Sequence, residues 1–307
     1  MARRSSILVA LLALGAGATA QPRPQVESVT VTGTKSRAAI AGFVQSLAKP
    51  TRLTGKLARW ETPICPLAVG LKPEHLKFVT DRLNQVAAQA GAPVDTKPDC
   101  RVNIQIVFTT APQALLDNVR KNQPSFLGVH DSEAQADRLA QVVRPIQAWY
   151  MSERVDQRGN VELEGAKHTE VLELQAYMPG RQPPWITLHL PNASAVTSTS
   201  TRLGDGLRSR FHQVMIVVDP GKLTQLEMGT VADYIALVAL TQLGDPGACQ
   251  SLPSIVNLLA SSCTPVEALT DNDRGYLRGL YHMSAQQSLA VQQDEIGYQM
   301  QRKADGK

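Results

Sequence analysis

The segment from Ile64 to Phe108 constrains the fold of this chain more than any other feature of the sequence. Apolar runs at its two ends, 64–70 and 102–108, predict strands, and the second run alternates apolar with polar residues. Between them, apolar residues spaced by three and four predict a helix over 73–90, with a proline in its first turn and Gly91 just past its end. Strand, helix and strand in this order form a βαβ unit, so we expect a parallel pair of strands.

The rest of the chain supplies further elements around this unit. We expect a buried strand over 214–218 and then a long helix over 224–243, with a capping box at Thr224–Glu227 and a stop at Gly244. Since apolar residues make up 43% of the chain, we expect one α/β domain of the α+β type over 56–307, after a partly flexible N-terminal extension over 21–55. The remaining predicted elements are helices 36–47, 113–121, 131–151 with a break or kink at Pro145, 270–282 and 288–302, and strands 29–32, 170–178 and 185–190, the last two as a hairpin.

The first twenty residues are typical of a secretory signal peptide. Arg3 and Arg4 precede an apolar run over 7–14, and small residues at 18 and 20 mark a cleavage site after Ala20. An uncleaved anchor is the alternative, but the apolar run is far too short to span a bilayer. No later stretch is apolar over a bilayer's thickness, so we expect a periplasmic or secreted mature chain without a membrane span.

Export makes disulfide bonds possible. The four cysteines allow three pairings, and we favour Cys65–Cys100 and Cys249–Cys263 because each pair would close one local unit. A zinc site built from these cysteines would need a close spacing such as C-x-x-C, and the sequence contains none.

The charge and the remaining polar residues point to no particular chemistry. A formal net charge of +4 does not predict a nucleic-acid binder. The sequence lacks the motifs of serine hydrolases, phosphate-binding loops and HExxH peptidases, and no two histidines have the helical spacing that holds zinc. His189 and His212 lie on or beside predicted strands, and Glu162 and Glu164 share one strand face, but we interpret both pairs as ordinary polar residues.

Three short segments carry a resemblance to a known family. Leu57–Trp60 precedes the first core strand, Pro253–Asn257 forms a turn, and Leu269–Tyr281 has the pattern L-T-x-x-D…L-x-x-L-Y. Together with the βαβ unit, over roughly Lys56 to Tyr281, they resemble the metzincin-like zinc peptidase domain, and more closely a group of secreted bacterial proteins with a degenerate version of it. The resemblance implies a zincin-like mixed sheet, a long former active-site helix and C-terminal helices.

The resemblance places the two histidines of the peptidase motif at Ala232 and Ala236, and the glutamate at Asp233. Alanine cannot bind a metal, and the segment from 243 to 263 contains no histidine for a third ligand. The resemblance therefore implies the fold without zinc or another cofactor, and the fold alone does not carry the activity. For Asp233 we favour a structural role over a catalytic one: a cap, an ion pair with an arginine, or a position facing solvent.

Three hypotheses for the function remain. The first is an exported, non-catalytic metalloprotease-like protein, a pseudoenzyme that binds or scaffolds an extended peptide or an envelope protein. The alternative is a hydrolase with an atypical, non-zinc site in the same cleft, using Asp233, Tyr234 or the histidines; it predicts Asp233 in a concave pocket with a raised pKa. The third is a structural envelope protein without peptidase ancestry, which a wholly antiparallel sheet would favour.

Overall fold

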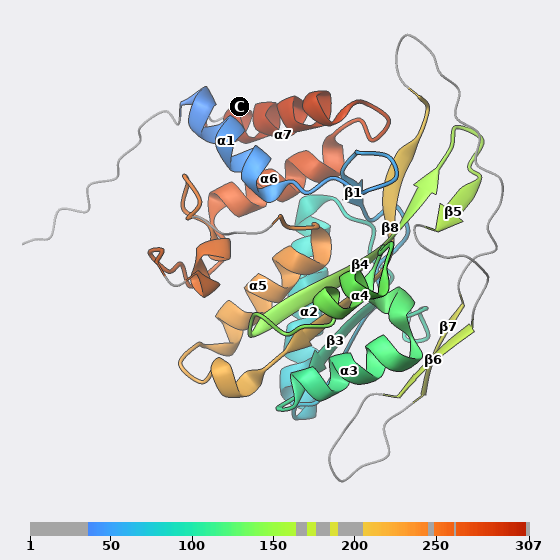
Figure 1. Ribbon diagram of the computed structural model, residues 1–307. Coiled ribbons are helices and arrows are strands. Elements are labelled where there is room, and N and C mark those ends of the chain that lie inside the picture. Colours follow the sequence, from blue (N-terminus) through green and yellow to red (C-terminus); the bar gives the residue numbers. More distant parts are fainter. Residues whose placement is uncertain are drawn as a thin grey trace, which may run out of the picture. The chain divides into compact units, whose positions relative to one another are not determined.

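A computed structural model describes residues 36–163, 171–175, 185–189, 205–244, 249–260 and 262–304. The predicted signal peptide and the predicted strand at 29–32 lie outside the described residues. In the unit formed by residues 34–307, helices flank a six-stranded mixed sheet (Figure 1). The predicted α+β fold class is therefore confirmed.

The sheet contains the predicted βαβ unit at one edge and antiparallel strands at the other. β1, β2, β3 and β8 pair in parallel, whereas β4 and β5 are antiparallel to their neighbours. The wholly antiparallel sheet that would favour a structural envelope protein is thus not observed. The strands lie in the order β2 (Pro66–Val69), β3 (Ile104–Phe108), β8 (Arg208–Val218), β4 (Ile146–Val155) and β5 (Val161–Leu163), and β1 (Ala58–Arg59) also pairs with β8.

Helix α2 (Pro73–Ala90) joins β2 to β3 and has the predicted bounds. It ends at Gly91, whose φ of 88° lies in the left-handed region that favours glycine. The first predicted strand is shorter than expected, because Ile64 forms only an isolated bridge with Val94.

Most of the other predicted elements are confirmed within a few residues. These are α1 (Arg37–Leu47), α3 (Pro112–Asn122), α6 (Asp271–His282), α7 (Leu289–Ala304) and the antiparallel hairpin of β6 (Val171–Gln175) and β7 (Trp185–His189).

The predicted helix over 131–151 is wrong over most of its length. Only Glu133–Leu139 is helical (α4), and the chain then enters strand β4. The intervening proline cannot continue a helix, and it disfavours the helical conformation in the residue before it. After it, side chains alternate between two cores: Trp149 packs in one and Tyr150 against the other. Pairing with β8 decides the structure here, because a short apolar run alone does not distinguish strand from helix.

Helix α5 (Met228–Leu240) is shorter at both ends than the predicted helix over 224–243. It begins after Glu227, whose side chain makes no capping hydrogen bond, so the predicted capping box is wrong. The preceding residues form turns instead, in which Leu226 N–H donates to the carbonyl of Leu223. The predicted stop at Gly244 is also wrong, because Gly244 N–H donates to Leu47 O at the end of α1 and lies in an extended segment.

Two hydrophobic cores lie on opposite faces of the sheet. The larger one contains α2, α5 and α6 together with α1 and α7. The smaller one lies beneath α3, α4 and the 3-10 helix η1 (Pro124–Leu127), as Figure 1 shows for the green helices in front of the sheet. The strand β4 contributes side chains to both cores, so its position is fixed from two sides.

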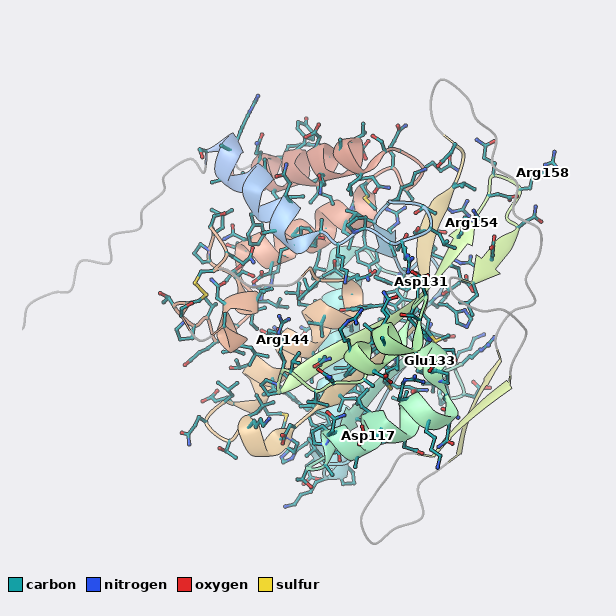
Figure 2. All side chains as sticks on the ribbon, viewed as in Figure 1. Asp117, Asp131, Glu133, Arg144, Arg154 and Arg158 are labelled. Atoms are coloured by element: carbon teal, nitrogen blue, oxygen red, sulfur yellow. A yellow bond between two sulfur atoms is a disulfide. The ribbon has the colours of Figure 1, made fainter. Side chains whose placement is uncertain are left out.

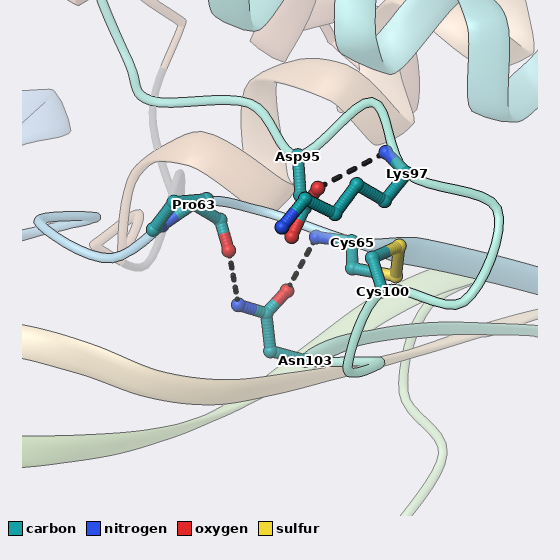
Figure 3. Close-up of a disulfide and its surroundings, with 6 residues drawn as sticks. All are labelled: Pro63, Cys65, Asp95, Lys97, Cys100 and Asn103. Carbon is teal, nitrogen blue, oxygen red and sulfur yellow. Dashed lines mark hydrogen bonds between the residues drawn. A yellow bond between two sulfur atoms is a disulfide. The ribbon is translucent and has the colours of Figure 1, made fainter.

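Both predicted disulfides are confirmed: Cys65–Cys100 and Cys249–Cys263. Beside the first of them, the side-chain amide of Asn103 donates to the carbonyl of Pro63 at 3.0 Å and accepts from Cys65 N–H at 2.7 Å (Figure 3). The disulfide and this amide together hold the start of β2 against the segment that leads into β3. Among the described residues, no helix is long and apolar enough to cross a bilayer.

Candidate functional site

Helix α5 carries the three positions at which the family resemblance places a peptidase motif. All of its residues from Thr230 to Leu240 are buried. Ala232 and Ala236 are both 0% exposed and belong to the larger core. Their methyl groups therefore fill a packed interior and offer no atom that could bind a metal.

Asp233 is buried on the same helix, with 3% of its surface exposed. Its Oδ1 accepts a hydrogen bond from Arg82 Nε on α2 at 2.5 Å, and its Oδ2 accepts one from the backbone N–H of Leu269 at 2.9 Å. The carboxylate thus joins α5 both to α2 and to the segment that precedes α6. Of the roles considered for Asp233, the ion pair with an arginine is the one observed.

The other segments of the resemblance pack around α5 and α6. Trp60 Nε1 donates to the carbonyl of Ala239 on α5 at 2.8 Å. Asp273 forms a capping box with Thr270 at the start of α6, and its carboxylate also accepts from Ser254 Oγ at 2.5 Å. Burial raises the pKa of Asp273, although these hydrogen bonds act in the opposite direction. The predicted turn at 253–257 and the start of α6 therefore form one hydrogen-bonded unit.

A pair of a buried glutamate and a half-buried histidine lies where β4 meets β8, and the sequence analysis did not identify it. Gln213 and Phe211 pair with successive residues of β4, which leaves His212 as the extra residue of a β-bulge. His212 Nδ1 lies 2.7 Å from Oε1 of Glu153, and Arg210 Nε donates to Oε2 of the same carboxylate at 2.6 Å.

Glu153 is held in its ionised form by these two neighbours. Burial alone would raise its pKa, but the hydrogen bonds and charges of His212 and Arg210 outweigh burial, so the pKa of this carboxyl lies below its usual value. Side chains alternate along β4, which places Glu153 on the same face as Met151 in the smaller core. The pair therefore lies on the opposite face of the sheet from α5. No local motif signals it, because the two residues are 59 positions apart in the sequence.

The remaining candidates from the sequence do not form a common site among the described residues. Glu162 on β5 pairs with Arg154 on β4. Glu164 and the side chain of His189 lie outside the described residues. Within the described part of the chain, no three His, Cys, Asp or Glu side chains are arranged to hold a metal ion.

The hydrogen bonds of β8 fix which backbone groups of β4 point outward. Val214 N–H donates to Asn103 O, and Val218 O accepts from Thr109 N–H, so both residues use their backbone groups toward β3. In an antiparallel ladder, the backbone N–H and C=O groups of two opposed residues either hydrogen-bond to each other or point to the outer sides of the two strands. The residues of β4 opposite 214, 216 and 218 therefore direct their N–H and C=O groups away from β8.

These outward residues are Ile146, Ala148 and Tyr150, which we call the β4 edge. Strand β5 pairs with β4 only further along, at 153–155, so no described strand pairs with the β4 edge. Gly128 bounds it at one end, because a Cβ built there would lie 2.8 Å from the carbonyl oxygen of Tyr150. At the other end it begins at Ile146, which is only 2% exposed, so the partly exposed Ala148 is the accessible part of the edge.

The β4 edge lies beside the C-terminal half of α5. Tyr150 donates its hydroxyl hydrogen bond toward the carbonyls of Val238 and Thr241, at 2.7 Å and 3.1 Å. Burial raises the pKa of this phenol, so it remains a donor at neutral pH. Figure 2 labels Arg144 next to the start of β4, and Asp131 and Glu133 near α4, so charges of both signs flank the strand.

The fold and these contacts define an α+β protein in which helix α5 is part of the core and no described strand pairs with one edge of β4. Comparison of the chain with models of protein families, with curated proteins and with solved structures finds no match. The metzincin-like resemblance thus stays a prediction from the sequence.

Proposed function

We propose that this chain is an exported, non-catalytic metzincin-like protein that binds an extended peptide along the β4 edge. The observation that carries the proposal is the outward N–H and C=O of the partly exposed Ala148, which no described strand pairs; Ile146 is buried and Gly128 lies against the carbonyl of Tyr150. An added strand satisfies such groups because its own N–H and C=O groups recur with the same two-residue period. The main chain of the peptide would supply affinity, and side chains on either side of β4 would supply selectivity.

Two further observations support parts of the proposal. Ala232 and Ala236 are enclosed in the core, which supports a binding role rather than zinc peptidase chemistry. The two disulfides fit an oxidising compartment outside the cytosol and so support export.

Selection of a phage-displayed library of random peptides on the purified mature protein tests the proposal. The deciding variant is Ala148→Pro, which removes one outward N–H and leaves the ladder to β8 intact, because proline is tolerated where an edge N–H faces solvent. Ala148→Val is the matched control, since it changes the side chain at the same position and keeps the N–H. We expect the selected peptides to bind the native protein and Ala148→Val, and to lose most of their affinity for Ala148→Pro.

Two results would overturn the proposal. One is a selection that enriches no peptide. The other is a set of selected peptides that bind Ala148→Pro as tightly as the native protein. A thermal unfolding curve of Ala148→Pro that matches that of the control shows that a loss of binding comes from the edge and not from misfolding.

The alternative function, a hydrolase with an atypical site beside α5, stays a prediction from the sequence. Asp233 is engaged by Arg82 and Leu269, and the glutamate–histidine pair lies on the opposite face of the sheet. Cleavage of a selected peptide during prolonged incubation with the native protein, and not with the Asp233→Asn variant, would favour the hydrolase.

A further inference from the structure

A cleft of about 300 Å³ lies between α1 and α7, away from β4 and the former-motif positions of α5. Ile40 and Gly297 line it and are both buried where α1 and α7 pack: a Cβ built on Gly297 would lie 3.7 Å from Cγ2 of Ile40. The absence of a side chain at 297 therefore lets the two helices approach closely beneath the cleft. Residues 293, 297 and 301 follow one another at four-residue spacing, so one continuous face of α7 forms this wall.

The chemistry of the walls combines an aromatic ring with planar polar groups. Tyr298 is 59% exposed, so its ring offers a free apolar face beside the opening. Gln293 and Gln301 each supply amide donors and a carbonyl acceptor. Arg37 and Asp294 add one positive and one negative charge, so the formal charges of the cleft balance.

We propose that this cleft binds a neutral saccharide of one or two rings. A sugar ring presents C–H groups on its faces, which pack on an aromatic ring, and hydroxyl groups at its rim, which both donate and accept hydrogen bonds. The balanced charge favours a neutral ligand over an anion. The volume lies at the lower end of the range of about 300–1,000 Å³ for small-molecule sites, which limits the size of the ligand. This inference is independent of peptide binding at β4.

Titration of the isotope-labelled mature protein with three disaccharides, followed by amide NMR, tests this inference. The probes are N,N′-diacetylchitobiose, cellobiose and maltose at millimolar concentrations. We expect at least one of them to shift the amide signals of residues 37–41 and 293–301 in a saturable way. Tyr298→Ala should weaken this binding about tenfold or more, whereas Tyr298→Phe, which keeps the ring, should retain it.

Two further variants separate the cleft from general surface effects. Ala41→Leu should abolish binding because its larger side chain fills the cleft, and it should keep the fold because Ala41 is exposed on α1 and leucine is a good helix former. Phe78→Ala removes another exposed aromatic side chain, on α2, and should leave the titration unchanged.

Three results would overturn the inference. The first is that none of the probes shifts these signals. The second is that binding survives in both Tyr298→Ala and Ala41→Leu. The third is self-association of the native protein that Tyr298→Ala abolishes in sedimentation experiments, which would assign this face to a contact between two copies of the chain.

Discussion

Replacing Asp233 by alanine should lower the free energy of unfolding by about 3 kcal/mol. The substitution removes the acceptor of two hydrogen bonds that hold α5 to α2 and to the start of α6. The N–H of Leu269, a residue only 2% exposed, would lose its acceptor, which costs about 1–3 kcal/mol. The guanidinium of Arg82 would lose its ion pair, but its side chain is 24% exposed and also binds Gln85, so we assign this loss only about 1–2 kcal/mol.

Urea unfolding followed by circular dichroism measures this change. The matched control is Asp81→Ala on α2, which breaks the exposed ion pair between Asp81 and Lys77 and should cost less than about 0.5 kcal/mol. Asp233→Asn, which keeps an oxygen acceptor for Leu269, should fall between the two. If Asp233→Ala were as stable as Asp81→Ala, the structural role assigned to this carboxylate would be refuted.

Three more predictions concern other parts of the molecule. Replacing both cysteines by serine should lower the free energy of unfolding by about 4 kcal/mol for Cys65–Cys100, which closes the longer loop, and by about 3 kcal/mol for Cys249–Cys263. An unchanged urea midpoint would contradict this. The pKa of Glu153 is lower in the folded state than in the unfolded state, so its ionised form stabilises the fold above the unfolded pKa. This contribution is lost as the pH falls below about 4.5 and through the folded pKa. When the free energy of unfolding is measured against pH in acid, Glu153→Gln should therefore lose less stability than the native protein. The purified protein should contain far less than one zinc per chain by elemental analysis, and Ala232→His with Ala236→His should destabilise the core by overpacking without creating a zinc site; one zinc per chain in either protein would contradict this.

The βαβ unit was predictable because the residues that determine each of its elements lie within that element or at its ends. The proline in its first turn and Gly91 mark both ends of α2, and the alternating residues before Phe108 mark a buried strand. The two disulfides were also predictable, since each joins cysteines of one local unit. These features need no knowledge of how distant segments pair.

The incorrect predictions depend on distant pairing. The segment that forms β4 has the composition of a helix as much as of a strand, and only its ladder with β8 decides between them. After the early end of α5, the chain likewise makes contacts distant in sequence: Gly244 N–H donates to Leu47 O at the end of α1.

In the candidate site too, positions within one segment were predictable and their distant partners were not. The resemblance identified Ala232, Asp233 and Ala236, but not that Arg82 would be the partner of Asp233, 151 residues away. The pairing of Glu153 with His212 depends on a β-bulge between strands, and no sequence spacing encodes it. The β4 edge could not be predicted either, because it depends on the register between β4 and β8.

Hydrogen exchange at single amides of β4 tests the central claim most directly. In the free protein, the amide of the partly exposed Ala148 should exchange faster than those of Gln147 and Trp149, which face β8. Addition of a selected peptide should slow the exchange of Ala148 and leave Gln147 and Trp149 unchanged. Exchange at Ala148 that is already as slow as at its two neighbours, or that a bound peptide does not alter, would contradict peptide binding along this strand.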